Sequence, residues 1–114
     1  MRRAALVATL AAVLAAALPA PLAGGAGRVS VYVIDNAFLR GVQRPDVRIA
    51  RDTTVTWRWR AQQSHGLAVR SGPARFTAAV RTRGGFSHRF TRAGTYRIVC
   101  PLHAPGMKMT VVVR

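Results

Sequence analysis

One short stretch near the C-terminus gathers three side chains that bind soft metal ions. Cys100, His103 and Met107 place a thiol, an imidazole and a thioether within the run Cys-Pro-Leu-His-Ala-Pro-Gly-Met. Sulfur and imidazole donors of this kind suit copper. Cys100 is the one cysteine of the chain, so no disulfide can form within it. We interpret it as a metal ligand rather than a buried inert thiol or half of an intermolecular bridge.

A copper site with one thiolate also needs a second imidazole, and the sequence offers two. His65 ends a tryptophan-containing segment and stands directly before the next strand-like segment, where a side chain can reach a neighbouring loop. His88 alternates with Phe86 and Phe90 inside a strand-like run. We therefore expect His65 to be the ligand and His88 to be structural.

Two methionines compete for the place of a weak fourth ligand. Met107 closes the Ala-Pro-Gly turn after His103, whereas Met109 belongs to the last strand-like segment and should face the core or solvent. The sequence therefore favours Met107.

From Arg28 onward, β-branched residues and a period of two dominate, which is typical of half-buried strands. We expect strands at residues 29–34, 47–49, 54–60, 66–70, 86–90, 96–100 and 109–113, separated by glycine, proline and asparagine turns. Residues 71–84 have the least strand character, and we expect them to cross between sheets as a loop. The pattern predicts an all-β fold, a Greek-key two-sheet β-sandwich of about seven to eight strands.

Residues 1–26 have the order of a secretory signal peptide. Two arginines precede an apolar run, Ala4–Leu18, and small residues with prolines follow up to Ala26. The run is shorter than the roughly 20 residues that span a bilayer, so we favour export over a retained anchor. The expected mature domain is 27–114, located in the periplasm or outside the cell.

The chain is strongly basic, with a formal charge of +15. Without Arg2 and Arg3 the remaining basic residues still exceed the three aspartates by 13. This charge should attract acidic partners or an anionic membrane surface, including the outer face of the cytoplasmic membrane. The arginines are scattered along the chain and form no continuous basic run, which together with export argues against nucleic acid as the partner.

Several motifs together resemble the plastocyanin/amicyanin-type cupredoxins, over about residues 28–114. Thr54-Val55-Thr56-Trp57, eight residues before His65, is similar to the strand that leads to the first ligand of that family. The Gly-x-Tyr-x-x-x-Cys run from Gly94 to Cys100 is similar to the strand that delivers the thiolate. Cys-x-x-His followed by methionine completes the resemblance. Gly66 departs from it, because asparagine is common at that place.

The resemblance implies a role for each ligand of a single copper ion that alternates between Cu(I) and Cu(II). His65 would be the buried imidazole, Cys100 the thiolate that gives a blue colour, and His103 the exposed imidazole through which electrons pass. Met107 would be the axial ligand that tunes the reduction potential.

We therefore expect a small exported electron carrier that acts as a monomer. Its redox partner would be acidic and would dock at the apolar residues around His103. The chain shows no nucleophile–base pair and no water-activating metal pattern, so we expect no enzymatic activity. The alternative is a periplasmic or extracellular protein that binds and delivers copper, and a visible thiolate-to-copper band would separate the two.

Overall fold

The computed structural model describes residues 27–114, and these form strands joined by turns and loops. The strands are β1 (Arg28–Ile34), β2 (Ala37–Arg40), β3 (Val42–Gln43), β4 (Asp46–Ile49), β5 (Thr53–Ser71), β6 (Thr77–Phe90), β7 (Gly94–Val99) and β8 (Lys108–Val113). Their number agrees with the predicted seven to eight. The predicted signal peptide lies outside the described residues. Within 27–114, no helix has the length and apolar character needed to cross a membrane.

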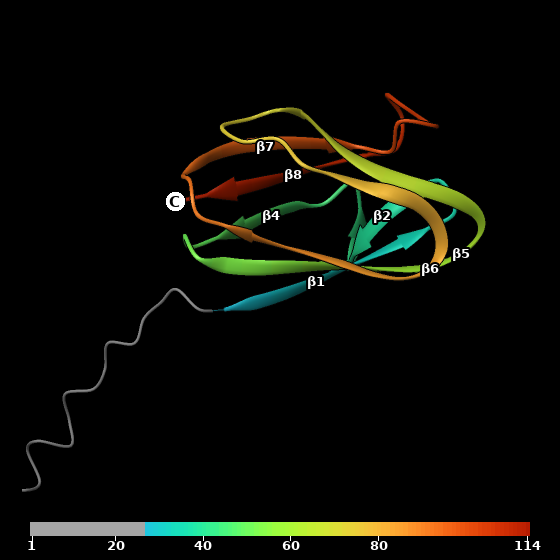
Figure 1. Ribbon diagram of the computed structural model, residues 1–114, viewed down its shortest axis with the longest axis horizontal. Coiled ribbons are helices and arrows are strands. Elements are labelled where there is room, and N and C mark those ends of the chain that lie inside the picture. Colours follow the sequence, from blue (N-terminus) through green and yellow to red (C-terminus); the bar gives the residue numbers. More distant parts are fainter. Residues whose placement is uncertain (1–26) are drawn as a thin grey trace, which may run out of the picture.

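The strands form a mixed sheet that curls over itself, so the all-β prediction is confirmed. The hydrogen-bonded order is β3-β2-β1-β5-β7-β8-β4, and β6 pairs with β5. The β1–β5 and β4–β8 pairs are parallel, whereas the other pairs are antiparallel. Figure 1 shows β4, β7 and β8 on one side of the molecule and β1 with the first part of β5 on the other. The two layers of the expected sandwich are thus joined into one continuous sheet.

The long strand β5 makes this continuity possible, because it belongs to both layers. Its first part pairs with β1, and its last part pairs with β7. The pairing with β6 shifts register between Arg60 and His65 and again between His65 and Leu67. The segments 54–60 and 66–70 are therefore one strand with an irregular middle, and His65 lies in that irregular part.

The expectation of a loop over residues 71–84 was wrong for most of that range, since β6 begins at Thr77. The strand pairs with β5 alone, and Ala78 is buried while Val80 is half exposed. Backbone pairing with β5 therefore holds the first part of this strand without the regular apolar alternation on which a sequence pattern depends.

The core lies between the two layers and draws large side chains from both. Trp57, Phe90, Tyr96 and Ile98 are among its fully buried members. The Tyr96 hydroxyl donates a hydrogen bond to the Arg92 carbonyl at 2.8 Å, and burial raises the pKa of this phenol. These contacts anchor β7, the strand that leads to Cys100.

His88 packs in an aromatic cluster, in agreement with the structural role predicted for it. Its ring stacks on Phe76 with centroids 3.9 Å apart and meets the ring of Phe90 nearly edge-on at 4.8 Å. It pairs with Val55 in the first part of β5, ten residues before His65. Burial lowers the pKa of His88, because it disfavours the charged imidazolium.

This lowered pKa predicts a loss of stability in acid that depends on His88. The unfolded chain binds the proton more readily than the folded one. The contribution of His88 is therefore complete above its ordinary pKa of about 6.5 and falls as the pH drops through the folded value. In copper-free protein, His88→Phe keeps the stacking and removes the titration. Thermal unfolding between pH 7.5 and 5 should show the wild-type melting temperature falling faster than that of the variant. Parallel curves would contradict this assignment.

Candidate metal centre

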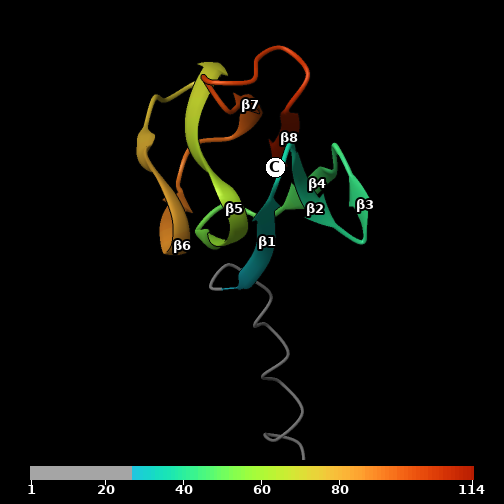
Figure 2. The same ribbon diagram turned by 90° about the vertical axis from the view of Figure 1, so that its right-hand side faces the viewer.

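The structure brings together three of the four predicted ligands at one end of the molecule. One ligand atom each from His65, Cys100 and His103 lies within 4.8 Å of the others. His65 comes from the irregular part of β5, Cys100 directly follows β7, and His103 lies in the loop that leads to β8. Figure 2 shows this loop at the same end of the molecule as the bend of β5.

The spacing of these donors fits one ion of the size of copper. Metal bonds of about 2.0–2.3 Å to nitrogen and sulfur, arranged in a plane at about 120°, place the donor atoms roughly 3.7 Å apart. The His65 Nδ1 atom is 4.0 Å from Cys100 Sγ. The imidazole rings of His65 and His103 have centroids 4.9 Å apart. Two imidazoles and a thiolate therefore converge with little movement needed to hold an ion.

Burial differs among the residues of this centre. His65 and Cys100 are fully buried and Met107 is 2% exposed, whereas His103 is half-buried. The buried residues would shield an ion held here from solvent, and the ion would be nearest to the surface at the His103 ring.

The loop from Cys100 to Met107 is closed by backbone hydrogen bonds. The His103 N–H donates to the Cys100 carbonyl at 3.0 Å, and the Met107 N–H donates to the His103 carbonyl at 3.2 Å. The Cys100 N–H in turn donates to the Met107 carbonyl at 3.0 Å. These bonds hold the loop in a compact turn that keeps the thiol and the imidazole on the same side.

His65 is held from two directions. The Trp59 indole N–H donates to the His65 backbone carbonyl at 2.6 Å, and the His65 Nε2 atom is 2.9 Å from Asp35 Oδ1. An ionised carboxylate only accepts hydrogen bonds, so the ring proton is assigned to Nε2. This leaves the lone pair of Nδ1 directed to the side where Cys100 Sγ lies.

Asp35 is a site residue that the sequence reasoning missed. It lies in the turn between β1 and β2, and it also accepts hydrogen bonds from the backbone N–H groups of Gln62 and Gln63. The hydrogen bond to His65, followed by those from Gln63 and Gln62, lowers the pKa of the Asp35 carboxyl. One signal in the sequence was its rarity, because Asp35 is one of three acidic residues and directly follows the first strand.

Met107 and Met109 have clearly different surroundings. The sulfur of Met109 accepts a hydrogen bond from the Trp57 indole N–H at 3.2 Å, inside the core. The backbone of Met107 belongs to the closed loop, and its side chain is buried. The Met109 sulfur is therefore committed to the core, which supports the choice of Met107 for a fourth ligand.

Gly66 lies where β5 and β6 leave little room for a side chain. A Cβ atom at this position would lie 3.1 Å from Val80 Cγ1 and 3.2 Å from the Ala78 carbonyl oxygen. An asparagine here would require Val80 or the β6 backbone to shift by a few tenths of an ångström. The hydrogen bonds of Asp35 join the turn after β1 to the irregular part of β5.

Comparisons with known proteins agree with the fold and the centre. The chain is 34% identical over 107 residues to amicyanin-alpha of Methylorubrum extorquens, covering 90% of this chain and 86% of that protein. A structure of an amicyanin variant with Cu(I) matches with a TM-score of 0.63 and 27% identity, covering 83% of this chain and 88% of the other. A purple cupredoxin from Nitrosopumilus maritimus has the same TM-score at 23% identity, covering 75% and 99%. No family model matches the chain.

The curled β-fold and the His65–Cys100–His103 cluster have the architecture of a copper-binding β-protein. At this level of identity and coverage, the chain belongs to the amicyanin family of cupredoxins. It is a small blue-copper electron-transfer protein with copper as its cofactor, and its partner is a redox protein.

The contrasting surroundings of the two methionines lead to a matched pair of variants. Met109→Leu should leave the visible spectrum of the copper-loaded protein unchanged. It should cost about 1–3 kcal/mol of stability, because the buried Trp57 N–H loses its acceptor. Met107→Leu should shift the visible bands and raise the reduction potential, measured by absorption and voltammetry. A spectrum that changes in Met109→Leu and not in Met107→Leu would reverse the assignment.

Proposed function

We propose that this protein is an exported carrier of single electrons, with one copper ion held by His65, Cys100, His103 and, axially, Met107. The observation that carries the proposal is the convergence of two imidazoles and one thiol within 4.8 Å. One of these imidazoles, that of His103, is half-exposed. Bound copper supplies the one-electron Cu(I)/Cu(II) couple. The protein contributes a donor set held by hydrogen bonds, and a rigid site needs little rearrangement when the charge of the ion changes.

Electrons would enter and leave through the ring of His103. Leu102, which is 58% exposed, lies beside it together with exposed Ala104 and Pro105. Small apolar surfaces of this kind suit short-lived contacts between redox proteins. The rim around His103 would make contact with the partner, while the buried residues would hold the ion.

A basic hollow next to this rim favours an acidic partner. Its volume is about 310 Å³, and its lining includes Pro105 of the ligand loop together with Asp46 and the basic residues Arg44, Arg70, Arg97 and Lys108. All four basic side chains are exposed. The hollow thus has four cationic side chains and one carboxylate close to His103. This positive charge would steer an acidic surface toward His103 and orient it there. The same charge would attract an anionic membrane surface.

Burial of the ligands also supports a carrier rather than an enzyme or a copper-delivery protein. His65 and Cys100 are fully enclosed, and Met107 is nearly so. Substrate would have no approach to the ion from that side, and a copper acceptor could reach only His103.

One structural neighbour is a copper nitrite reductase from Thermus scotoductus, and the match covers 25% of that chain. The carrier would act as a monomer, and the pattern of residues 1–26 supports its export.

A spectrum of the copper-loaded mature domain tests the proposal. Wild-type protein with Cu(II) should absorb strongly near about 600 nm, the region of thiolate-to-copper charge transfer in sites of this type. Cys100→Ser should abolish the band while leaving a folded domain by circular dichroism, because only the sulfur is removed. Voltammetry should show a reversible one-electron couple. A colourless wild-type protein that still binds copper would favour the delivery function.

The basic hollow predicts slower electron exchange with anions when its charge is reversed. Oxidation of the Cu(I) protein by hexacyanoferrate(III) moves one electron to the iron and restores the blue band, which stopped-flow absorption can follow. Arg97→Glu with Lys108→Glu should slow this reaction by on the order of tenfold at low ionic strength, and salt should reduce the difference.

Arg28→Glu with Arg51→Glu is the matched control, since it makes the same change in net charge at exposed positions. Arg28 is the first residue of β1, at the end of that strand far from Asp35, and Arg51 lies in the turn before β5. Equal slowing in both double variants would show that net charge alone, and not the hollow, governs the encounter.

A further inference from the structure

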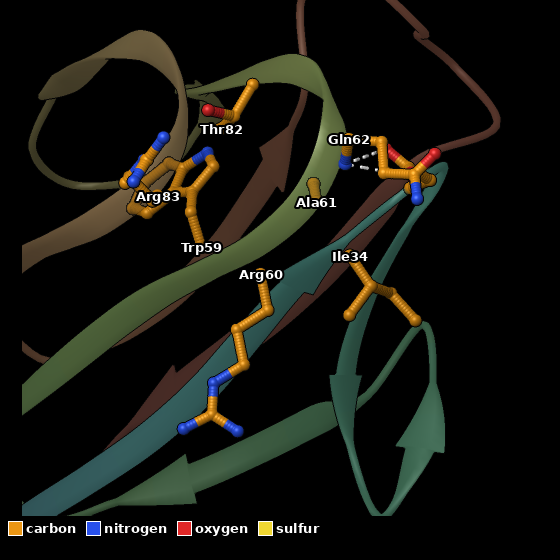
Figure 3. Close-up of a pocket in the computed structure, with 8 residues that line it drawn as sticks. Ile34, Trp59, Arg60, Ala61, Gln62, Thr82 and Arg83 are labelled. Atoms are coloured by element: carbon orange, nitrogen blue, oxygen red, sulfur yellow. Dashed lines mark hydrogen bonds between the residues drawn. The ribbon is translucent and has the colours of Figure 1, made fainter.

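Asp35 joins the proposed ligand His65 to the backbone that carries it. Its Oδ1 atom is 2.9 Å from both His65 Nε2 and the Gln63 backbone nitrogen. The Gln62 backbone nitrogen lies 3.2 Å from Oδ1 and 3.1 Å from Oδ2. Three donors from the irregular part of β5 therefore converge on one carboxylate, which itself comes from the turn after β1. The dashed lines at Gln62 in Figure 3 mark two of these bonds.

No arginine among residues 27–114 forms an ion pair with this carboxylate. Among residues 27–114, the only ion-pair partner within 4.0 Å of Asp35 is His65. Arg60 lines the neighbouring hollow, yet its guanidinium lies 4.7 Å from the centre of the Tyr32 ring and points away from Gln62 (Figure 3). The Asp35 side chain is 37% exposed, while the imidazole it contacts is fully buried. The Asp35 carboxylate therefore has solvent on one side and the buried imidazole on the other.

We propose that Asp35 is a positioning residue that holds His65 ready for copper and favours the Cu(II) state. The proposal rests on the ligand set given under the proposed function. The carboxylate keeps the ring proton on Nε2, so that Nδ1 presents a lone pair to the ion. The same carboxylate accepts hydrogen bonds from the backbone N–H groups of residues 62 and 63. These bonds fix the backbone just before His65 and therefore the position of its ring.

The effect on the reduction potential follows from the charge. A carboxylate that accepts a hydrogen bond from the Nε2–H group makes the imidazole a stronger electron donor. A stronger donor and a nearby negative charge stabilise Cu(II) more than Cu(I), which lowers the potential.

Two variants separate positioning from charge. Asp35→Asn keeps an oxygen that can accept from His65 and removes the charge, whereas Asp35→Ala removes both. Cu(II) affinity, measured by competition with a chelator of known affinity, should fall in Asp35→Ala by about 10–100-fold. Asp35→Asn should lose less. The reduction potential should rise in both variants. The rise should be about 59 mV for each tenfold loss of Cu(II) affinity beyond the loss of Cu(I) affinity.

Asp52→Asn is the control, because it removes the same charge from a half-exposed residue in the turn before β5, where Asp52 pairs with Arg89. Nitrogen-15 NMR of the copper-free proteins provides a readout that needs no metal. Wild type should show a single His65 tautomer with the proton on Nε2 and slow exchange of the Gln62 and Gln63 amides. Asp35→Ala should show mixed tautomers and faster exchange.

The outcomes distinguish this inference from the proposed function. If wild type is blue but both Asp35 variants match Asp52→Asn in affinity, potential and NMR, the inference is overturned and the carrier function stands. If wild type never becomes blue, the carrier function fails, and the NMR comparison still decides whether Asp35 positions His65. Should Asp35→Ala fail to fold, a raised potential in Asp35→Asn supports the role of the charge, and an unchanged one refutes it.

Discussion

The centre depends on a single constraint: β5 passes from one layer of the sheet to the other near His65, the first of the proposed ligands. Strand pairing holds β5 to β1 before this point and to β7 after it. The irregular segment between these pairings turns His65 inward, toward the end of the strand that delivers Cys100. The irregular backbone is stabilised by the Trp59 indole, which donates to the His65 carbonyl, and by the Asp35 carboxylate, which accepts from the N–H groups of Gln62 and Gln63.

Much of this arrangement could be predicted from residue types and spacing. Alternating apolar residues indicated β1, β7, β8 and both parts of β5, because each has one face in the core. Cys100, His103 and His65 could be selected because soft donors are rare in this chain and stand at strand ends. His88 could be set aside because its alternation with Phe86 and Phe90 requires a place among aromatic rings, as the stacking on Phe76 shows.

The features that escaped prediction depend on contacts between distant segments. Asp35 and Asn36 read as an ordinary turn, and nothing local indicates that the carboxylate meets a histidine 30 positions later. The tight contact at Gly66 comes from Ala78 and Val80 in the first part of β6, where the apolar pattern is weak and backbone pairing with β5 holds the strand. The hydrogen bond from the Trp57 indole to the Met109 sulfur likewise joins residues 52 positions apart. Such pairings follow from the topology of the sheet, which periodicity alone does not specify.

The closed ligand loop has a consequence for how such proteins can diverge. Its three closing bonds run between backbone groups of Cys100, His103 and Met107, and none involves the side chains of Leu102 or Ala104. The residues that would meet a partner are thus largely separate from those that shape the loop. Mutations can therefore alter the outer rim, and with it the choice of partner, while the geometry around the metal is preserved. Recognition and redox chemistry can evolve at different rates within one stretch of eight residues.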